Sequence, residues 1–455
     1  MDAGSRAQTD PGELVRRTRK EQRLTLAQLG KLTGYSPAQV SRYERGISPL
    51  TDVTVLRVFA NALGIAPQAL GLTPQPDIRH GRVIGPTTAY PRLPASKVAG
   101  TARWEDGEDP VRRRQLLANL AVTVAATAGA PVLHSGRPPV NEAALGKILV
   151  ARLRDAMLGL HHDITVPSGA APNTDLSRAL TDFHTCRYGS LAVRLPRLIH
   201  AGHAHSASGG DCALLAQSYL LATRMLIKLD EQQLGWMAAD RARQTAEAAG
   251  DVLLVAEAAR QLAVLARKAD WHEQAMSIAL TAADHPGLRG GGPDHAAERG
   301  LLIQSAAYTA ARAGDAAGMR ELTGEAAAIA GELGGTVLLR DHGGGFSPTT
   351  VQLHLISAEN SAGDPSTALA AARAVAPQSL PSTERRARYY TDIAAAYGRW
   401  GRRDDCVRAL LAAEHHAPEE THARPAVKSL VSGLLVSGRV TTELRGLAAR
   451  TGVLV

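Results

Sequence analysis

Residues 24–46 read LTLAQLGKLTGYSPAQVSRYERG, and this stretch decides the fold of the N-terminal part of the chain. Apolar residues recur at helical spacing on both sides of Gly34, and Thr25 and Ser36 stand where helix N-caps are expected. Pro37 follows at the first helical position, where its missing N–H costs nothing. The stretch therefore predicts two short helices joined by a tight turn at Gly34, which ends the first helix in a left-handed conformation.

The flanking segments extend this pair into one compact domain over residues 1–73. Further helices are predicted at about 12–23, 52–63 and 67–70. Helical periodicity places these residues of the first three helices in the core: Leu14, Val15, Thr18, Leu26, Leu29, Leu32, Val40 and Tyr43. Two short helices joined in this way are the sequence form of a helix-turn-helix, whose second helix enters the major groove of DNA.

Composition predicts an all-α protein. The chain has 455 residues, is rich in alanine, and contains only 4% aromatic residues, which fits close helix packing better than a sheet core. Its net charge of +8 is concentrated at one end: residues 1–115 carry 18 Lys/Arg against 11 Asp/Glu, and the rest carries 33 against 32. This excess fits the phosphates of DNA, although RNA or an anionic membrane would fit it as well.

The first domain resembles the Cro-like (XRE) helix-turn-helix family. The matching positions are, in order, Arg19, Leu24, Thr25, Leu26, Leu29, Gly34, Ser36, Val40, Ser41, Glu44, Gly46, Leu56, Ala60, Leu63, Gly64 and Ile65. The resemblance implies a five-helix, lambda-repressor-like domain that binds double-stranded operator DNA, usually as a dimer. Many relatives have glutamine where Leu26 stands, so one contact to DNA made by them is in doubt here.

The resemblance also implies a structural role for two charged residues. Arg19 and Glu44 match a partly buried ion pair that locks the first helix against the end of the third. A guanidinium–carboxylate pair can be bidentate, and losing one partner leaves a buried charge unpaired. The alternative is that Arg19 and Glu44 are independent solvated charges.

Candidate DNA contacts lie on the outer face of the third helix. Four residues match base-facing positions of the family, namely Ser36, Pro37, Ala38 and Arg42, and two more share the outward face, Gln39 and Ser41. Arg42 can form two hydrogen bonds to the O6/N7 edge of guanine, and Pro37 and Ala38 can touch a thymine methyl. Phosphate contacts, which set register, are expected from Thr25, Lys31 and Arg45. Alternatively, Arg42 is a solvated surface arginine.

Regular structure is not expected directly after this domain. Residues 74–110 contain six prolines and no helical period, which predicts a semi-rigid linker. Arginines at 112–114 then precede an apolar stretch, Gln115 to Leu133, that imitates an export signal or a membrane span. This stretch lies behind a complete domain and contains polar residues, so we expect a soluble helix, with membrane anchoring as the alternative.

Helical patterns recur through residues 111–455. The clearest unit, Tyr390 to Pro418, is similar to a tetratricopeptide (TPR) helix pair: Ala394 and Ala413 let two antiparallel helices approach, and Gly401 makes the turn. Weaker copies, at irregular spacings of roughly 38 to 49 residues, lie around Asp270, Gly314 and Gly363. These patterns predict a TPR-like α-solenoid, and an ordinary hairpin in a helical bundle is the alternative.

No pattern indicates an enzyme, a cofactor or a bound metal. The glycines of the loops at 285–295 and 334–348 lack the Gly-Lys-Ser/Thr ending of a Walker loop. The histidines within 161–163 and 200–205 have no cysteine partners and lie near predicted turns, so we expect no zinc site. The three cysteines, Cys186, Cys212 and Cys406, form no CxxC pair and are expected to be buried thiols of a cytoplasmic protein.

Two functions from different classes fit this organisation. The leading hypothesis is a homodimeric, nucleoid-associated transcriptional regulator that resembles the XRE–TPR type of actinobacteria. That resemblance implies a peptide or small-molecule effector in the groove of the solenoid. The alternative is a protein-interaction scaffold that the helix-turn-helix localises to DNA. The sequence leaves the operator, and the choice between activation and repression, open.

Overall fold

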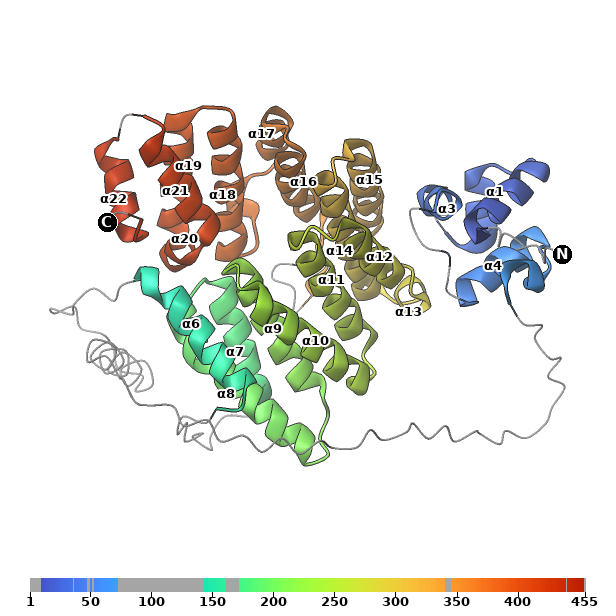
Figure 1. The fold of residues 1–455 in the computed structure, drawn as a ribbon, viewed down its shortest axis with the longest axis horizontal. Helices are drawn as coiled ribbons and strands as arrows, with labels where there is room; N and C mark the ends of the chain where they lie inside the picture. The colour runs from blue at the N-terminus through green and yellow to red at the C-terminus, as the bar shows by residue number, and fades with distance from the viewer. Residues whose placement is uncertain are drawn as a thin grey trace, which may run out of the picture. The chain divides into compact units, whose positions relative to one another are not determined.

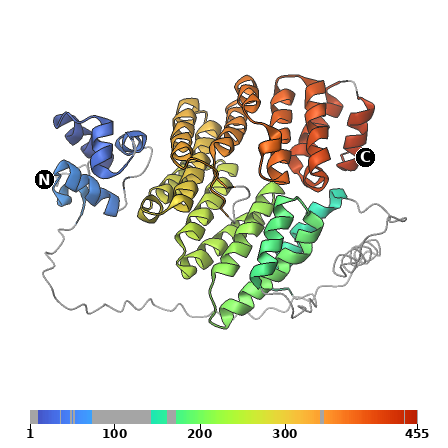
Figure 2. The ribbon, with the colours of Figure 1, turned by 180° about the vertical axis from the view of Figure 1, so that it is seen from behind.

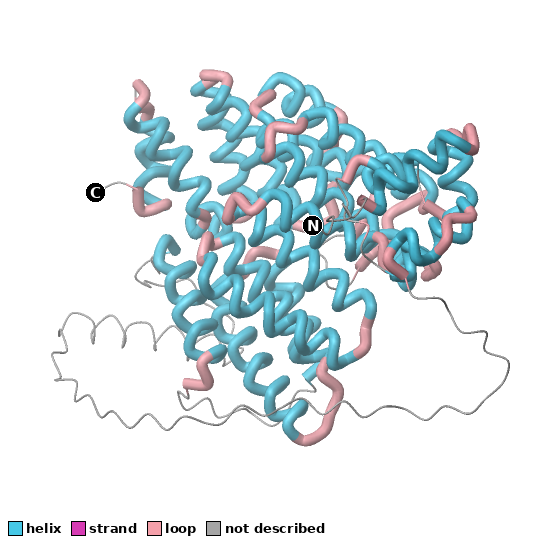
Figure 3. The backbone as a smooth tube through the Cα atoms, turned by 45° about the vertical axis from the view of Figure 1, so that its right-hand side comes forward, coloured by secondary structure: helices cyan, strands magenta, loops and turns pink. Residues whose placement is uncertain are grey.

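The computed structural model describes residues 10–35, 37–46, 50, 53–72, 142–160, 172–339, 345–438 and 440–453. Within these ranges the chain is all-α, as composition predicts, and the one β-contact there is an isolated bridge between Val337 and Phe346. Figure 3 shows the helices joined by short loops. The chain divides into two compact units, one made of residues 1–50 and 137–455 and the other of residues 51–136.

Three short helices open the first unit: α1 (Pro11–Glu21), α2 (Leu26–Thr33) and α3 (Pro37–Glu44). Thr25 caps α2 as predicted, since its hydroxyl accepts a hydrogen bond from the backbone N–H of Gln28 at 3.2 Å. The side chain of Gln28 in turn accepts one from the backbone N–H of Thr25 at 2.8 Å. Gly34 ends α2 with φ at 76°, the left-handed conformation that favours glycine.

Leu32 on α2 differs from the prediction, because its side chain is 58% exposed. The buried residues of this helix are Leu29, Gly30 and Thr33. A buried stripe that passes through Leu26 continues three, four and seven positions later. Leu32 lies six positions after Leu26, so it falls beside the stripe, and its predicted place in the core is wrong.

The second unit contains α4 (Val53–Leu63) and the 3-10 helix η1 (Pro67–Leu70), which pack against each other. Four apolar residues of α4 that share one helical face are buried: Val55, Leu56, Phe59 and Leu63. Both helices lie where the sequence pattern predicts them.

The rest of the first unit is an array of helices (Figure 1). Its elements are α6 (Glu142–Met157), α7 (Pro172–His184), α8 (Tyr188–Ala207), α9 (Ala213–Lys228), α10 (Gln232–Ala249), α11 (Val252–Lys268), α12 (His272–Ala283), α13 (Pro286–Arg289), α14 (Pro293–Arg312), α15 (Ala316–Glu332), α16 (Pro348–Ala362), α17 (Pro365–Arg373), η2 (Pro377–Ser379), α18 (Thr383–Arg399), α19 (Arg403–His416), α20 (Pro418–Ala423), α21 (Pro425–Val436) and α22 (Thr442–Arg450).

Consecutive helices of the array pair as hairpins, such as α9 with α10, α14 with α15, and α18 with α19. The first helix of each hairpin also packs against the first helix of the next, so α9, α11, α14, α16 and α18 form a continuous row. Ala394 and Ala413 are fully buried, and Gly401 makes the predicted turn with φ at 76°. The region is therefore repeat-like, whereas its assignment to the TPR family stays a prediction.

The two ends of the array meet. Helix α6 packs against α20, and α7 packs against α18 (Figures 1 and 2). A buried ion network lies at this junction, where Lys228 Nζ on α9 is 2.6 Å from Glu384 Oε1 and 2.9 Å from Glu420 Oε1. Burial alone would raise the pKa of Glu420, but Lys228 and Arg424 outweigh it and leave that pKa below its ordinary value. The junction is thus held by ionised groups.

Several predictions from sequence concern residues 73–141 and 161–171, which lie outside the described residues. They include the linker at 74–110, the apolar stretch at 115–133 and the histidines near 161.

In the described ranges no helix is both long and apolar enough to span a bilayer. There, no group of three or more His, Cys, Asp or Glu side chains is placed to hold a metal ion. Cys186 and Cys406 are buried and Cys212 is half-buried, all as free thiols.

Gly300 on α14 tests the packing of the array. A Cβ atom at this position would lie 2.3 Å from the ring of Phe346, which is fully buried. We expect Gly300→Ala to lower the free energy of unfolding by about 1–3 kcal/mol, because the ring must move. Gly324→Ala on α15 is the matched control, since a Cβ there meets nothing within 4 Å. It should be neutral or stabilising by up to about 1 kcal/mol, and equal destabilisation of both variants in thermal unfolding would contradict this packing.

Candidate nucleic-acid interface

Arg19 on α1 and Glu44 at the end of α3 form a two-point ion pair. Arg19 Nε lies 2.5 Å from Glu44 Oε1, and Nη2 lies 2.8 Å from Oε2. The remaining terminal nitrogen donates to the carbonyl of Leu24 at 2.7 Å. The two side chains are 11% and 4% exposed, and the hydrogen bond to Glu44 raises the pKa of Arg19. The pair ties α3 to α1 and to the chain that enters α2.

Two side chains of α3 differ from their expected orientation. The sequence predicts that Gln39 and Arg42 face solvent, yet they are only 1% and 3% exposed. Helix α3 packs against α15 of the array, and the polar atoms of both side chains meet acidic residues there and at the end of α12. The expected exposure of Gln39 and Arg42 is therefore not found, because residues more than 200 positions away cover them.

Asp284, which follows α12, accepts hydrogen bonds from α3. Gln39 donates to it through its side-chain amide, and Tyr43 donates through its hydroxyl. Burial raises the pKa of Asp284 to about 6, although the hydrogen bond from Tyr43 and the nearby arginines oppose this rise. Asp284 is 5% exposed. A buried carboxyl thus takes up the amide donors that Gln39 would offer to a base edge.

Glu325 on α15 pairs with the predicted guanine-reading residue. Arg42 Nη2 lies 2.7 Å from Glu325 Oε2, and the two side chains are 4% and 7% exposed. Arg299 on α14 holds the other oxygen of Glu325 at 3.0 Å. Arg42 also donates to the side-chain oxygen of Gln39, which orders the two residues together. In the described part of the chain, Nη1 of Arg42 has no hydrogen-bond partner.

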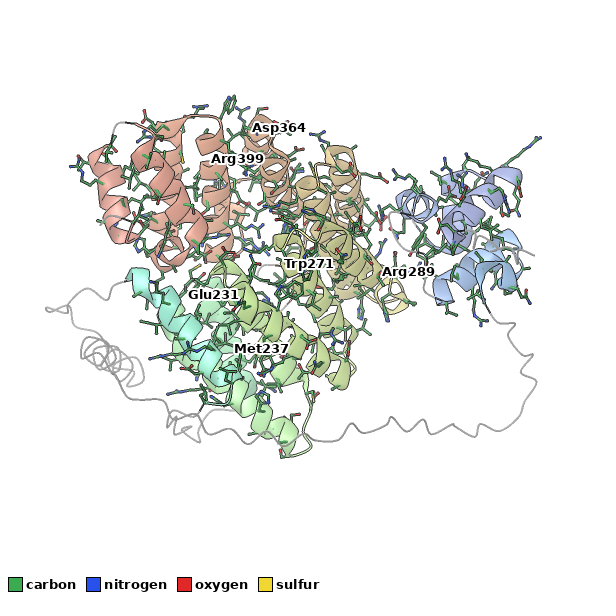
Figure 4. All side chains as sticks on the ribbon, in the orientation of Figure 1. Glu231, Met237, Trp271, Arg289, Asp364 and Arg399 are labelled. Carbon is green, nitrogen blue, oxygen red and sulfur yellow. The ribbon has the colours of Figure 1, made fainter. Side chains whose placement is uncertain are left out.

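Tyr35, in the turn before α3, adds an aromatic contact. The guanidinium of Arg289 on α13, labelled in Figure 4, lies 3.8 Å from the centroid of the Tyr35 ring and donates to its hydroxyl at 2.6 Å. The Tyr35 ring in turn meets Tyr43 edge-on at 5.5 Å. A cation over a desolvated ring contributes about 2 kcal/mol. This contact therefore strengthens the association of α3 with the array.

The other predicted DNA contacts differ in how exposed their side chains are. Pro37 is exposed and Ser41 is half-buried on α3, whereas Ser36 and the side chain of Ala38 lie outside the described residues. The Thr25 hydroxyl is exposed but engaged in the α2 cap. Lys31 and Arg45 are both exposed, and Arg45 lies 3.4 Å from Glu321 on α15.

The partners of α3 and of the turn before it were missed by sequence reasoning. Asp284 follows α12, Glu325 lies on α15 and Arg289 lies on α13, and the three residues belong to no motif. The glycine-rich segment that begins at residue 285 was the nearest signal, and it contains α13 with Arg289.

Comparison with known families supports the N-terminal assignment. A family model described as a helix-turn-helix domain matches residues 12–70. The comparison with curated proteins gave no match, and neither did the comparison with solved structures. The chain therefore carries a helix-turn-helix, which is a DNA-binding domain, while its subtype rests on the sequence resemblance alone.

The Arg19–Glu44 pair gives a prediction for the stability of this domain. We expect Arg19→Ala to cost about 3–5 kcal/mol, because it leaves Glu44 buried without its cation. Hydrogen exchange of α1 and α3 amides in the full chain measures this loss. Arg17→Ala is the control, since Arg17 and Glu21 are 63% and 64% exposed and 3.7 Å apart, a pair worth less than about 1 kcal/mol. Unchanged protection in Arg19→Ala would contradict a stabilising pair.

Proposed function

We propose that this chain is a sequence-specific DNA-binding transcriptional regulator whose helical array controls the recognition helix α3. One observation carries the proposal. Gln39 and Arg42, which occupy the base-reading face of a helix-turn-helix, are paired with Asp284 and Glu325 of the array. Carboxylates placed against these donors compete with the acceptor atoms of base edges, so the arrangement is a closed state.

Base reading would use the chemistry of these same side chains. An arginine donates two hydrogen bonds to O6 and N7 of guanine, and a glutamine pairs with N6 and N7 of adenine. Arg42 and Gln39 supply both groups on one face of α3. The exposed Lys31 and Arg45 would contact phosphates and set the register.

Control of DNA binding follows from a two-state equilibrium. In the open state α3 leaves Asp284 and Glu325 and becomes free to enter the major groove. A ligand shifts this equilibrium only by its difference in affinity for the two states. Among the described residues Nη1 of Arg42 has no acceptor, which weakens the closed state, because a buried donor without an acceptor costs about 1–3 kcal/mol. We infer that a small-molecule or peptide effector of the array sets the balance.

A dimer is part of this proposal. A helix-turn-helix that reads one half-site gains affinity and specificity when two copies bind half-sites about 34 Å apart, which is one turn of DNA. Analytical ultracentrifugation of the full chain, alone and with operator, measures this stoichiometry.

Selection of a preferred duplex from random sequences, followed by titration of variants, tests the function. Arg42→Ala should reduce the ratio of operator to scrambled-duplex affinity by about 10- to 100-fold, because one bidentate base contact is worth about 1–3 kcal/mol. The ratio is informative because both duplexes require the open state. Arg45→Ala is the control and should weaken both duplexes alike. If wild-type protein binds scrambled duplex as tightly as the selected one, the proposal fails.

Glu325 provides a separate test of the closed state. We expect Glu325→Ala to raise operator affinity at least tenfold, because it leaves Arg42 buried without its carboxylate in the closed state only. Glu321→Ala is the matched control: Glu321 lies on the same helix, and its pair with Arg45 is 36% and 45% exposed. Such a pair contributes less than about 1 kcal/mol. Equal affinities of the Glu325 and Glu321 variants in fluorescence anisotropy would show that α3 is not held by Glu325.

A further inference from the structure

The helical array contains a partly open cavity of about 310 Å³. Its walls come from the row of first helices, α9, α11, α14, α16 and α18, together with α7 and the start of α21. This volume lies at the low end of the range for small-molecule sites, roughly 300–1,000 Å³. The cavity is therefore sized for a small molecule rather than for a long peptide.

Basic side chains dominate the lining of this cavity. Eight of the lining residues are Lys or Arg, and the one acidic residue among them is Glu384. Several of these cations are matched by carboxylates. Glu257 lies 2.6 Å from Arg260 and 3.3 Å from Arg224, and Lys228 lies between Glu384 and Glu420. These ion pairs fix the positions of the cations, but the residues that line the cavity still carry more positive than negative charge.

Arg267 on α11 is the clearest example of a cation in this lining that no carboxylate neutralises among the described residues. Its Nη1 donates to the backbone carbonyl of Ser305 at 3.1 Å, and its guanidinium lies 5.1 Å from the centroid of the Tyr308 ring. In the described part of the chain no carboxylate lies within ion-pair distance of Arg267. Burial lowers the pKa of Arg267 to about 10, and the neighbouring arginines, among them Arg388 and Arg260, add to this effect. An interior cation without a counter-charge is costly unless an anion joins it.

Arg388 on α18 lines the same cavity. Its Nη2 donates to the hydroxyl of Tyr308 at 2.6 Å, and its Nε lies 3.6 Å from Asp392 Oδ2. Tyr308 thus touches both arginines through one ring. Two guanidinium groups held in this way can bind a planar or tetrahedral oxyanion through paired hydrogen bonds.

His354 on α16 supplies a neutral polar group to the cavity. Its side chain is 8% exposed, and neither ring nitrogen has a hydrogen-bond partner in the described residues. Burial lowers the pKa of His354 far below its ordinary value, and the nearby arginines lower it further. The neutral ring offers one donor and one acceptor, so it fits a hydroxyl or another neutral polar group of a ligand.

We propose that this cavity binds a small organic anion that carries phosphate or carboxylate groups, with its charge between Arg267 and Arg388 and a neutral polar group at His354. The inference rests on the proposed function in one respect: this anion is the effector that shifts the closed state. The site itself depends only on the array.

Anion binding to the full-length chain tests the site. Pyrophosphate and citrate are the probes, with chloride at equal ionic strength as the reference, and calorimetry and thermal unfolding are the measurements. We expect at least one probe to raise Tm by about 2–4 °C at saturation. Arg267→Met should weaken that binding at least tenfold. Its Tm without anion should match or exceed that of wild type, because an unmatched buried charge has been removed.

Two controls separate binding from structural damage. Arg243→Met removes an exposed arginine of α10 that does not line the cavity, and it should keep the full response to the probe. His354→Phe keeps the ring against Tyr308 and should lower citrate affinity less than Arg267→Met does. If neither probe exceeds chloride, or if Arg243→Met and Arg267→Met lose the response equally, the anion site is overturned.

DNA titrations of the same samples distinguish the two proposals. Anion binding together with a change in operator affinity supports the effector role, and the change should vanish in Arg267→Met. Anion binding with no change in operator affinity overturns the effector role. Absence of sequence-specific DNA binding overturns the proposed function and leaves the calorimetric test of the anion site intact.

Discussion

The pairing of Lys228 with Glu384 and Glu420 is the interaction on which the array depends. One ammonium group joins α9 near the start of the array to α18 and α20 near its end. Removing Lys228 would take away the one cation that bridges the buried carboxylates Glu384 and Glu420, and breaking a buried ion pair in this way is strongly destabilising. A row of stacked helices has no intrinsic reason to close on itself, so a polar contact of fixed geometry specifies where its ends meet.

Closure of the array also explains why a charged cavity persists. The helices that line it are held together by ion pairs such as Arg224 on α9 with Glu257 on α11, and by the junction at Lys228. The cavity wall therefore stays in place although Arg267 and Arg388, which both line it, repel each other. A core of apolar residues would pack this space shut, whereas like charges oppose such packing and would favour the anion proposed above.

Local signals determined how much of the structure could be predicted. The Thr25 cap, the Gly34 turn and the Gly401 turn depend on neighbouring residues, and the sequence pattern located all of them. Leu32 was misplaced because leucine spacing was read without the stripe that passes through Gly30 and Thr33. The contact of Gln39 with Asp284 joins residues 245 positions apart, and no periodicity reveals such a pair. The basic lining of the cavity was missed for the same reason, since its cations lie on separate helices.

Helix α14 connects the cavity to the recognition helix. It carries Tyr308, which contacts both cavity arginines, and Arg299, which holds Glu325 against Arg42. These two residues are nine positions apart, about 14 Å along one rigid helix. Under the proposals above, an anion that draws Arg267 and Arg388 together would move the Tyr308 end of α14, and the Arg299 end would follow because a helix does not compress. The proposed closed state would then be biased through a single element that both proposed sites share, which is the physical requirement for coupling between them.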